Sequence, residues 1–224
     1  MLEVRFATLD ELVASVGNLP PEQFWSQPEQ NLLEQLHIPK RQREWMAGRI
    51  AAKQAVRQLL DSSGCTVPEP VDISIQSAPD RAPLVVWPKN RPAPSDVQIS
   101  ISHRAGWAGA AAVLAPARVG FDLEVIASRP PELVCSYLTA PEQAWIPGNP
   151  FLETLAWSIK ESIYKLWRGK HGSEPRDVEI QGTPTESSVW APLQLACHNM
   201  PSISEAGYRG FNGMLATYVT ARGD

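Results

Sequence analysis

The sequence predicts an α+β protein built of two similar lobes. In each half of the chain, one long amphipathic helical segment is followed by several short segments with the alternating pattern of strands. This order is typical of a helix packed on a mainly antiparallel sheet, and it occurs twice. We therefore expect a two-lobed, pseudo-symmetric architecture, with an N-terminal lobe over residues 1–117 and a C-terminal lobe over residues 118–224. The sequence itself shows no residue-level repeat between the two halves.

Composition and charge narrow the class of protein. A chain of 224 residues with 43% hydrophobic content is long enough to bury a substantial core. The net charge of −4 argues against nonspecific nucleic-acid binding, which needs a basic surface. No apolar run reaches the roughly 20 residues of a membrane span, and the N-terminus lacks the apolar core of a signal peptide. We expect a cytoplasmic protein whose three separated cysteines, Cys65, Cys135 and Cys197, are reduced thiols.

The elements of the first lobe follow from periodicity and from breaker residues. A strand is expected over 3–8, and then short helical pieces that prolines interrupt. Apolar residues at helical spacing predict a long helix over 40–62, which Gly64 can end. The proline-rich stretch that follows predicts a strand over 71–76 and then an irregular loop. Three strands complete this part as an antiparallel meander, over 97–102, 107–114 and 118–125.

In the second lobe, the strand over 118–125 is followed by a connecting loop over 126–149. We expect both at the junction of the lobes. Thr139 and Glu142 have the spacing of a capping box, which predicts a short helix over 140–146. Asn149 can cap a long helix that starts at Pro150 and ends near Gly169. Further strands are expected over 177–181, 188–197 and 208–220.

Two segments carry charged residues in a pattern that indicates chemistry. In the strand over 118–125, Asp122 and Glu124 share one face because side chains alternate. In the long helix after Pro150, Trp157, Glu161 and Lys165 lie on one stripe, with Lys160 beside it. If helix and strand meet, three carboxylates and two ammonium groups converge. Such a group suits a hard divalent cation and a polyphosphate.

The two motifs resemble a known family. Val-Gly-Phe-Asp-Leu-Glu at 119–124 and Trp-Ser-Ile-Lys-Glu-Ser-Ile-Tyr-Lys at 157–165 resemble the paired signature of the Sfp-type 4′-phosphopantetheinyl transferases. Four further segments agree in order and spacing, so the resemblance extends over about residues 40–170. These segments are Gly-Arg-Ile-Ala-Ala-Lys at 48–53, Pro-Leu at 83–84, Ser-Ile-Ser-His at 100–103 and Tyr-Leu-Thr-Ala-Pro-Glu at 137–142.

The resemblance implies the fold, the activity and the partners. It implies the 4′-phosphopantetheinyl transferase fold and transfer of the phosphopantetheine arm from coenzyme A to a serine of an acyl or peptidyl carrier protein. The other product would be 3′,5′-ADP. The implied cofactor is Mg²⁺, with Mn²⁺ as the alternative ion, and coenzyme A is the co-substrate. We expect a monomer that engages neither nucleic acid nor membrane.

The resemblance also implies roles for individual residues. Asp122, Glu124 and Glu161 would bind the metal ion, and Glu161 would also take the serine proton, directly or through a water. Lys160 and Lys165 would stabilise the diphosphate as charge moves to the leaving group. The 3′-phosphate of coenzyme A would be bound by Arg49 and His103.

The sequence departs from the family pattern at two places. Arg81 and Ala82 precede Pro83 where Gly-Lys-Pro is usual, so the basic contact carried there in some members is either absent or supplied by Arg81. Arg104 follows His103 where a small polar residue is commoner, which bears on the nucleotide pocket.

Other interpretations of these residues stay open. Taken alone, Asp122 and Glu124 fit the solvated face of an edge strand, and Glu161 and Lys165 fit an ordinary surface pair on a helix. A local anion site is predicted by a group of basic residues, for which solvated helix faces are the alternative. This group comprises Lys40, Arg41, Arg43, Arg49, Lys160, Lys165, Arg168 and Lys170.

Two other functions compete with phosphopantetheine transfer. One is a different metal-dependent phosphodiesterase, which would use the same carboxylates but transfer to water. The other is a noncatalytic module that binds carrier proteins, which would not need all three carboxylates. The segment 131–145 is expected to dock the carrier through Leu133, Val134, Tyr137 and Leu138. The alternative is that Tyr137 and Leu138 attach the following capped helix to the core.

Overall fold

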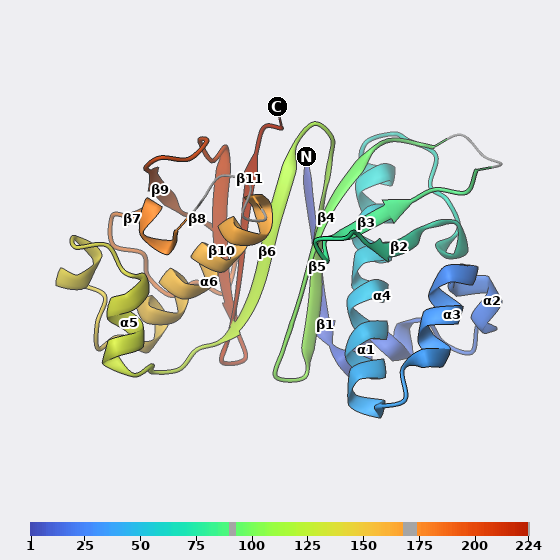
Figure 1. The fold of residues 1–224 in the computed structure, drawn as a ribbon, viewed down its shortest axis with the longest axis horizontal. Helices are drawn as coiled ribbons and strands as arrows, with labels where there is room; N and C mark the ends of the chain where they lie inside the picture. Colours follow the sequence, from blue (N-terminus) through green and yellow to red (C-terminus); the bar gives the residue numbers. More distant parts are fainter. Residues whose placement is uncertain (90–92, 168–173, 224) are drawn as a thin grey trace. The chain divides into compact units, whose positions relative to one another are not determined.

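A computed structural model describes residues 1–89, 93–167 and 174–223. The chain forms two compact units, Met1–Arg118 and Val119–Asp224, whereas the sequence placed the boundary after residue 117. Each unit contains a long helix packed on an antiparallel sheet, so the predicted α+β class is confirmed (Figure 1). None of the helices in the described ranges has the length and apolar character that crossing a membrane requires.

The N-terminal unit is built around α4, which packs on the middle strand of a three-stranded sheet, β1-β5-β4. Ala51, Ala52 and Ala55 of α4 are fully buried, and β5 presents a run of small residues to them. These small side chains allow α4 to pack closely on β5. The elements, where η denotes a short 3-10 helix, are β1 (Leu2–Thr8), α1 (Leu9–Ser15), α2 (Pro21–Phe24), α3 (Gln27–Gln35), α4 (Pro39–Ser62), η1 (Pro70–Asp72), β2 (Ser74–Ser77), β3 (Pro83–Val86), β4 (Val97–Arg104) and β5 (Trp107–Leu114).

The C-terminal unit repeats this plan with α6 against the sheet β6-β11-β10-β8. Leu155, Ile159 and Ile163 of α6 meet Leu215 and Val219 of β11 in the core. The elements are β6 (Arg118–Val125), α5 (Pro131–Tyr137), η2 (Glu142–Ala144), α6 (Pro150–Trp167), η3 (Pro175–Asp177), β7 (Val178–Gln181), β8 (Ala191–Pro192), β9 (Gln194–Cys197), β10 (Glu205–Phe211) and β11 (Met214–Ala221).

The expected three-stranded meander is wrong in its third strand. β4 and β5 do form an antiparallel hairpin, but β6 pairs with β11. The physical reason is that a strand has only two edges, and β1 already occupies the second edge of β5. Pairing of strands that are consecutive in sequence is the usual outcome, and here the first strand of the chain displaces it.

Five further predictions of local structure are corrected. The strand expected over 208–220 is the hairpin of β10 and β11, which turns at Asn212 and Gly213 with φ angles of 47° and 72°. Asn-Gly is a strong hairpin signal that the sequence analysis did not use. The strand expected over 71–76 is η1 followed by β2, and β3 lies in the stretch expected to be irregular. The connecting loop contains α5, and the helix expected over 140–146 is only the short η2.

The caps of the second lobe are confirmed. Asn149 Oδ1 accepts from the backbone N–H groups of Phe151 and Leu152 at 3.1 and 3.2 Å, so it starts α6 as predicted. Thr139 and Glu142 exchange the two hydrogen bonds of a capping box. The predicted end of the long helix near Gly169 lies outside the described residues.

Candidate functional site

Gly120 allows β6 and α6 to approach closely. A Cβ atom at this position would lie 1.8 Å from Ser162 O of α6, which is far inside van der Waals contact. The approach brings the buried carboxylate of Asp122 onto α6, where Ser158 Oγ donates to its Oδ2 at 2.9 Å. Lys165 Nζ donates to its Oδ1 at 2.7 Å. The glycine of the motif is therefore a packing requirement for the position of Asp122.

The three carboxylates predicted to act together are gathered in the C-terminal unit. Asp122 is 5% exposed, and Glu124 forms an ion pair with Arg129 at 3.5 Å between Oε2 and Nη2. Burial raises the pKa of Glu161, the charge of Asp122 raises it further, Lys165 opposes the rise and Glu124 adds to it. Because Glu161 senses both other carboxylates, they form one electrostatic cluster, which we call the carboxylate cluster (Asp122, Glu124 and Glu161).

Lys165 contacts the carboxylate cluster through β6 and not through a residue of its own helix, α6. Its ammonium reaches β6, where it donates to Asp122 and, at 3.1 Å, to Phe121 O. A simple surface pair with Glu161 four residues earlier is therefore not the arrangement found. The cluster already holds a positive charge that neutralises part of its negative charge.

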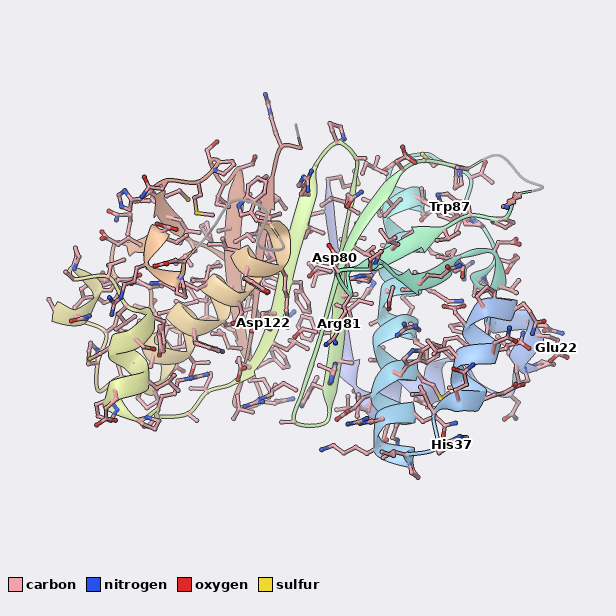
Figure 2. The ribbon with its side chains drawn as sticks, in the orientation of Figure 1. Glu22, His37, Asp80, Arg81, Trp87 and Asp122 are labelled. Atoms are coloured by element: carbon pink, nitrogen blue, oxygen red, sulfur yellow. The ribbon has the colours of Figure 1, made fainter. Side chains whose placement is uncertain are left out.

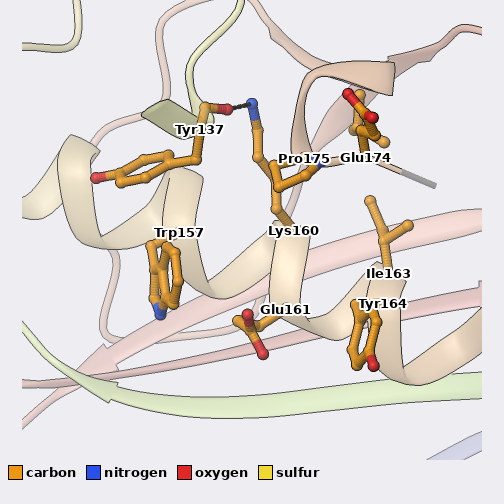
Figure 3. Close-up of a pocket in the computed structure, with 9 residues that line it drawn as sticks. Tyr137, Trp157, Lys160, Glu161, Ile163, Tyr164, Glu174 and Pro175 are labelled. Carbon is orange, nitrogen blue, oxygen red and sulfur yellow. Dashed lines mark hydrogen bonds between the residues drawn. The ribbon is translucent and has the colours of Figure 1, made fainter. Parts of the chain in front are cut away.

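Lys160 does not join the carboxylate cluster, which corrects its predicted place at the diphosphate. Its Nζ donates to Glu142 Oε2 at 2.6 Å and to Tyr137 O at 2.7 Å, and its side chain is 3% exposed. Figure 3 shows Lys160 and Glu161 pointing in opposite directions from α6. Burial lowers the pKa of Lys160, and Glu142 opposes this effect. An ammonium committed to two buried acceptors is not available to a substrate, so we assign Lys160 a structural role.

The donor set of the carboxylate cluster fits a hard divalent cation by its chemistry. Carboxylate oxygens are the ligands that Mg²⁺ prefers, and burial together with the nearby charges of Asp122 and Glu124 raises the pKa of Glu161, an effect that a bound cation would oppose. Within the described ranges, however, no three His, Cys, Asp or Glu side chains form a ready-made metal site. Lys165 and Arg129 instead pair with Asp122 and Glu124. Metal binding would require these two cations to release the carboxylates.

A small apolar cavity of about 70 Å³ lies beside Glu161 (Figure 3). Trp157 packs edge to face on Tyr137 in its wall, with ring centroids 5.3 Å apart. This contact gives Trp157 a packing role in the C-terminal unit. The cavity can hold a few non-hydrogen atoms of an uncharged chain. Its other lining residues are Lys160, Ile163, Tyr164, Glu174, Pro175 and Val178.

The N-terminal unit has a basic cavity of about 470 Å³ that brings together three of the five residues predicted to bind coenzyme A. Arg49, Arg81 and His103 all line it, and Arg41 adds a third guanidinium. Arg104 is not among its lining residues. We call this the basic cavity; its remaining lining residues are Leu36, Glu44, Trp45, Gly48, Ser77, Pro83 and Ile101.

Arg49 is a half-buried cation of the basic cavity with two contacts to its surroundings. Its guanidinium carbon lies 3.9 Å from the centroid of the Trp45 ring, and its Nε donates to Ile75 O at 3.3 Å. Burial lowers its pKa to about 10, opposed by Glu29, so it stays charged at neutral pH. A partly buried guanidinium stacked on an aromatic ring is well suited to recognise a phosphate.

Arg81 and His103 reach the same cavity from different elements. Arg81 lies in the turn between β2 and β3 with a φ of 66°, a left-handed conformation that favours glycine (Figure 2). The family pattern has glycine at this position, so the backbone conformation is one that glycine adopts at lower cost. His103 on β4 is 53% exposed, with Nε2 3.8 Å from Glu44 Oε2.

The remaining basic residues do not act together. Arg43 pairs with Asp10, and Lys40 lies 4.0 Å from Glu44 on the surface of α4. Arg168 and Lys170 lie outside the described residues. The alternative of solvated helix faces is therefore favoured for Lys40 and Arg43, whereas Arg41 and Arg49 share the basic cavity.

Two residues at these sites were not predicted from the sequence, Trp45 in the basic cavity and Arg129 beside Glu124, and Arg41 was predicted only as one of a larger group of basic residues. Arg41, Trp45 and Arg49 lie at i, i+4 and i+8 on α4, and this spacing alone predicts a shared face. The same spacing had been used for Trp157, Glu161 and Lys165. Arg129, which pairs with Glu124, carries no local signal because it lies in an irregular segment.

The expected apolar docking surface on segment 131–145 is mostly absent. Val134, Tyr137 and Leu138 are at most 1% exposed, and the hydroxyl of Tyr137 donates to Glu153 O at 3.1 Å. Burial raises the pKa of Tyr137 to about 12. This burial supports the alternative that Tyr137 and Leu138 attach the segment to the core, and Val134 belongs to the same core cluster. Only Leu133 of the group is exposed, at 43%.

The sequence of the C-terminal part matches a known family. Residues 118–196 match the model described as ACPS, the 4′-phosphopantetheinyl transferase superfamily. Over 134 residues, or 57% of this chain, the sequence is 38% identical to enterobactin synthase component D of Salmonella typhimurium. The match covers 49% of that protein, so the chain spans about half the length of this curated relative. These matches confirm the family resemblance predicted from the sequence.

Solved structures of holo-[acyl-carrier-protein] synthases also resemble parts of the chain. The Helicobacter pylori enzyme in complex with coenzyme A is 24% identical with a TM-score of 0.40, over 51% of this chain and 100% of that chain. The Bacillus anthracis enzyme in complex with CoA (3′,5′-ADP) is 23% identical with a TM-score of 0.41, over 50% of this chain and 93% of that chain. The Thermotoga maritima enzyme is 20% identical with a TM-score of 0.39, over 57% of this chain and 77% of that chain.

Proposed function

We propose, since residues 118–196 match the model of the 4′-phosphopantetheinyl transferase superfamily, that the chain transfers the phosphopantetheine arm of coenzyme A to a serine of an acyl or peptidyl carrier protein. The other product is 3′,5′-ADP, as for a holo-[acyl-carrier-protein] synthase. The observation that carries this proposal is the carboxylate cluster with Lys165 at 2.7 Å from Asp122. A phosphoryl-transfer site needs this combination of charges.

The chain's own residues account for the movement of the proton and the leaving group. The serine oxygen attacks the phosphorus that carries the pantetheine arm, and the bond from that phosphorus to the oxygen of 3′,5′-ADP breaks. Glu161 takes the serine proton, and its raised pKa makes it a stronger base than an ordinary carboxylate. Lys165 leaves Asp122 for the diphosphate and stabilises the negative charge that develops on the leaving oxygen.

Asp122, Glu124 and Glu161 would hold Mg²⁺, or Mn²⁺ in its place. When bound, the ion supplies charge neutralisation at the diphosphate oxygens. Release of Lys165 and of Arg129 from their carboxylates would accompany ion binding. In this proposal the two side chains act as counter-charges that keep buried carboxylates stable before the substrate arrives.

The basic cavity would bind the 3′-phosphate of coenzyme A. Arg49 is charged, stacked on Trp45 and partly buried, and Arg41 and Arg81 line the same space. The apolar cavity beside Glu161 would take part of the uncharged arm. A monomeric state, a cytoplasmic location and the lack of nucleic-acid and membrane partners stay predictions.

A mass measurement on carrier proteins tests the proposal. The full chain is incubated with coenzyme A, Mg²⁺ and a panel of apo-carrier proteins, and intact carrier masses and free 3′,5′-ADP are measured. We expect one carrier to gain one phosphopantetheine arm, with an equal amount of 3′,5′-ADP, and its Ser→Ala form to stay unmodified. Release of 3′,5′-ADP without a carrier would identify a phosphodiesterase. Carrier binding without any covalent change would identify a binding module.

A further inference from the structure

Asp122 is connected to three hydroxyl groups inside the C-terminal unit. Ser158 Oγ donates to Asp122 Oδ2 at 2.9 Å and lies 2.8 Å from Thr217 Oγ1. Thr217 Oγ1 in turn lies 2.8 Å from Ser162 Oγ. The three hydroxyl residues are fully buried, with 0% exposure, so water does not compete for these contacts.

The direction of the hydrogen bonds follows from the chemistry of the groups. An ionised carboxylate only accepts, and each hydroxyl has a single hydrogen to donate. The hydrogen of Ser158 therefore points to Asp122, and Ser158 accepts from Thr217. Thr217 has then used its own hydrogen, and Ser162 Oγ, which also donates to Thr217 O at 3.3 Å, shares its hydrogen between the hydroxyl and the main-chain oxygen of Thr217. The donors that lead to Asp122 are therefore Thr217 and then Ser158.

We infer that Ser158 is a positioning residue for Asp122, held in place by Thr217. The Asp122 carboxylate cannot turn about its Cβ–Cγ bond without breaking the bond from Ser158, and no water replaces a donor at 0% exposure. Ser158 thus fixes the plane of the carboxylate and keeps Oδ1 directed at Lys165. This inference rests on the proposed function, because it gives Asp122 the role of a metal ligand. Partners of this kind tune the affinity of a metal site.

A pair of matched serine variants tests this role. Ser158→Ala removes the contact with Asp122. Ser162→Ala removes a hydroxyl that lies on the same helix and is equally buried, but that does not contact Asp122. Mn²⁺ binding to the full chain, without coenzyme A or carrier, is measured by electron paramagnetic resonance, and melting temperatures are measured in parallel. We expect Ser158→Ala to weaken Mn²⁺ binding by about 10-fold or more. Ser162→Ala should keep the affinity of the unmodified chain, with a similar change in melting temperature.

The outcomes separate this inference from the proposed function. Equal Mn²⁺ affinities in the two variants would show that Ser158 only packs, and would overturn the positioning role. An unmodified chain that binds no Mn²⁺ would overturn both the metal assignment and this inference. The carrier-modification assay decides separately whether the chain is a transferase. As a second variant, Thr217→Val keeps the size of the side chain and should lower Mn²⁺ affinity less than Ser158→Ala does.

Discussion

Lys160 forms a buried ion pair with Glu142, with 2.6 Å between Nζ and Oε2. The N-terminal unit contains the same arrangement, in which Lys53 lies 2.7 Å from Glu29. In both units the lysine comes from the long helix and the glutamate from a capping box, and each lysine also donates to a main-chain oxygen. Each unit also has a two-stranded sheet, β2-β3 in the first and β7-β9 in the second. The backbone N–H of Ile75 in β2 donates to Glu29, and that of Ile180 in β7 donates to Glu142. The two units therefore share a residue-level repeat that the sequence did not reveal.

Lys160→Met should destabilise the protein strongly. Removing one partner of a buried pair leaves the Glu142 charge uncompensated, at a cost of about 3–5 kcal/mol in the free energy of unfolding. Chemical denaturation measures this loss, and Lys53→Met is the matched variant in the other unit. The double variant Lys160→Met with Glu142→Gln should regain part of the stability. A Lys160→Met protein of normal stability that has lost catalysis would instead restore Lys160 to the diphosphate.

Glu161→Gln should abolish transfer while the melting temperature stays nearly unchanged. The side chain is only partly buried, so the fold does not depend on its charge, but both metal binding and proton removal do. Asp122→Asn should also abolish transfer, with some loss of stability because Lys165 loses its partner. Intact mass of the carrier is the readout, with and without chelator, and the exposed Glu132→Gln of α5 is the control. Full turnover in excess chelator would reject the metal assignment.

Arg49→Ala should weaken coenzyme A use much more than carrier use. A charge-assisted contact contributes about 1.5–3 kcal/mol, which corresponds to roughly 10- to 100-fold in the KM for coenzyme A. His103→Ala should have a smaller effect because His103 is half exposed. Arg43→Ala, on the same helix but outside the basic cavity, is the control. For the unmodified chain, dephospho-coenzyme A should be a poorer donor than coenzyme A. For the Arg49→Ala variant, the two donors should differ little. Equal use of both donors by that chain would show that the cavity does not bind the 3′-phosphate.

Arg81→Gly should stabilise the fold and weaken coenzyme A binding at the same time. Glycine relieves the left-handed backbone at a φ of 66°, which is worth about 1–2 kcal/mol, but it removes a cation from the basic cavity. Arg81→Lys keeps the charge and the backbone cost, and it serves as the comparison. Denaturation and coenzyme A titration together separate the two effects. If Arg81→Gly binds coenzyme A normally, Arg81 does not replace the family's basic contact.

Leu133→Asp should leave stability unchanged, and Tyr137→Asp should not. Leu133 is 43% exposed on α5, whereas Tyr137 is 1% exposed and its burial cannot accommodate a charge. If the surface of α5 docks the carrier, Leu133→Asp also lowers carrier affinity while coenzyme A binding is retained. Leu32→Asp, at 39% exposure on α3, is the matched control. Unchanged carrier affinity in the Leu133 variant would reject docking at this position.

Much of the local structure could be predicted because it depends on short-range periodicity and capping. The bounds of α4 and the start of α6 at Pro150 follow from such signals. The pairing of β6 with β11 could not be predicted, because the two strands are far apart in sequence and their pairing depends on β1 occupying the edge of β5. The turn at Asn212 could have been found from the Asn-Gly pair.

By itself, the sequence determined the fold class, the family resemblance and the local positions of the three carboxylates, but not that they meet. Strand alternation and helix spacing place Asp122 and Glu124 on one face and Glu161 on a stripe, and these periodicities hold in any tertiary context. Only the tertiary structure decided what each charged side chain contacts. Lys160 and Glu161 are adjacent in sequence, yet Lys160 lies buried against Glu142 while Glu161 lies beside Asp122. The physical reason is that a helix sends neighbouring residues about 100° apart, and only the packed partners determine which side of the helix is buried.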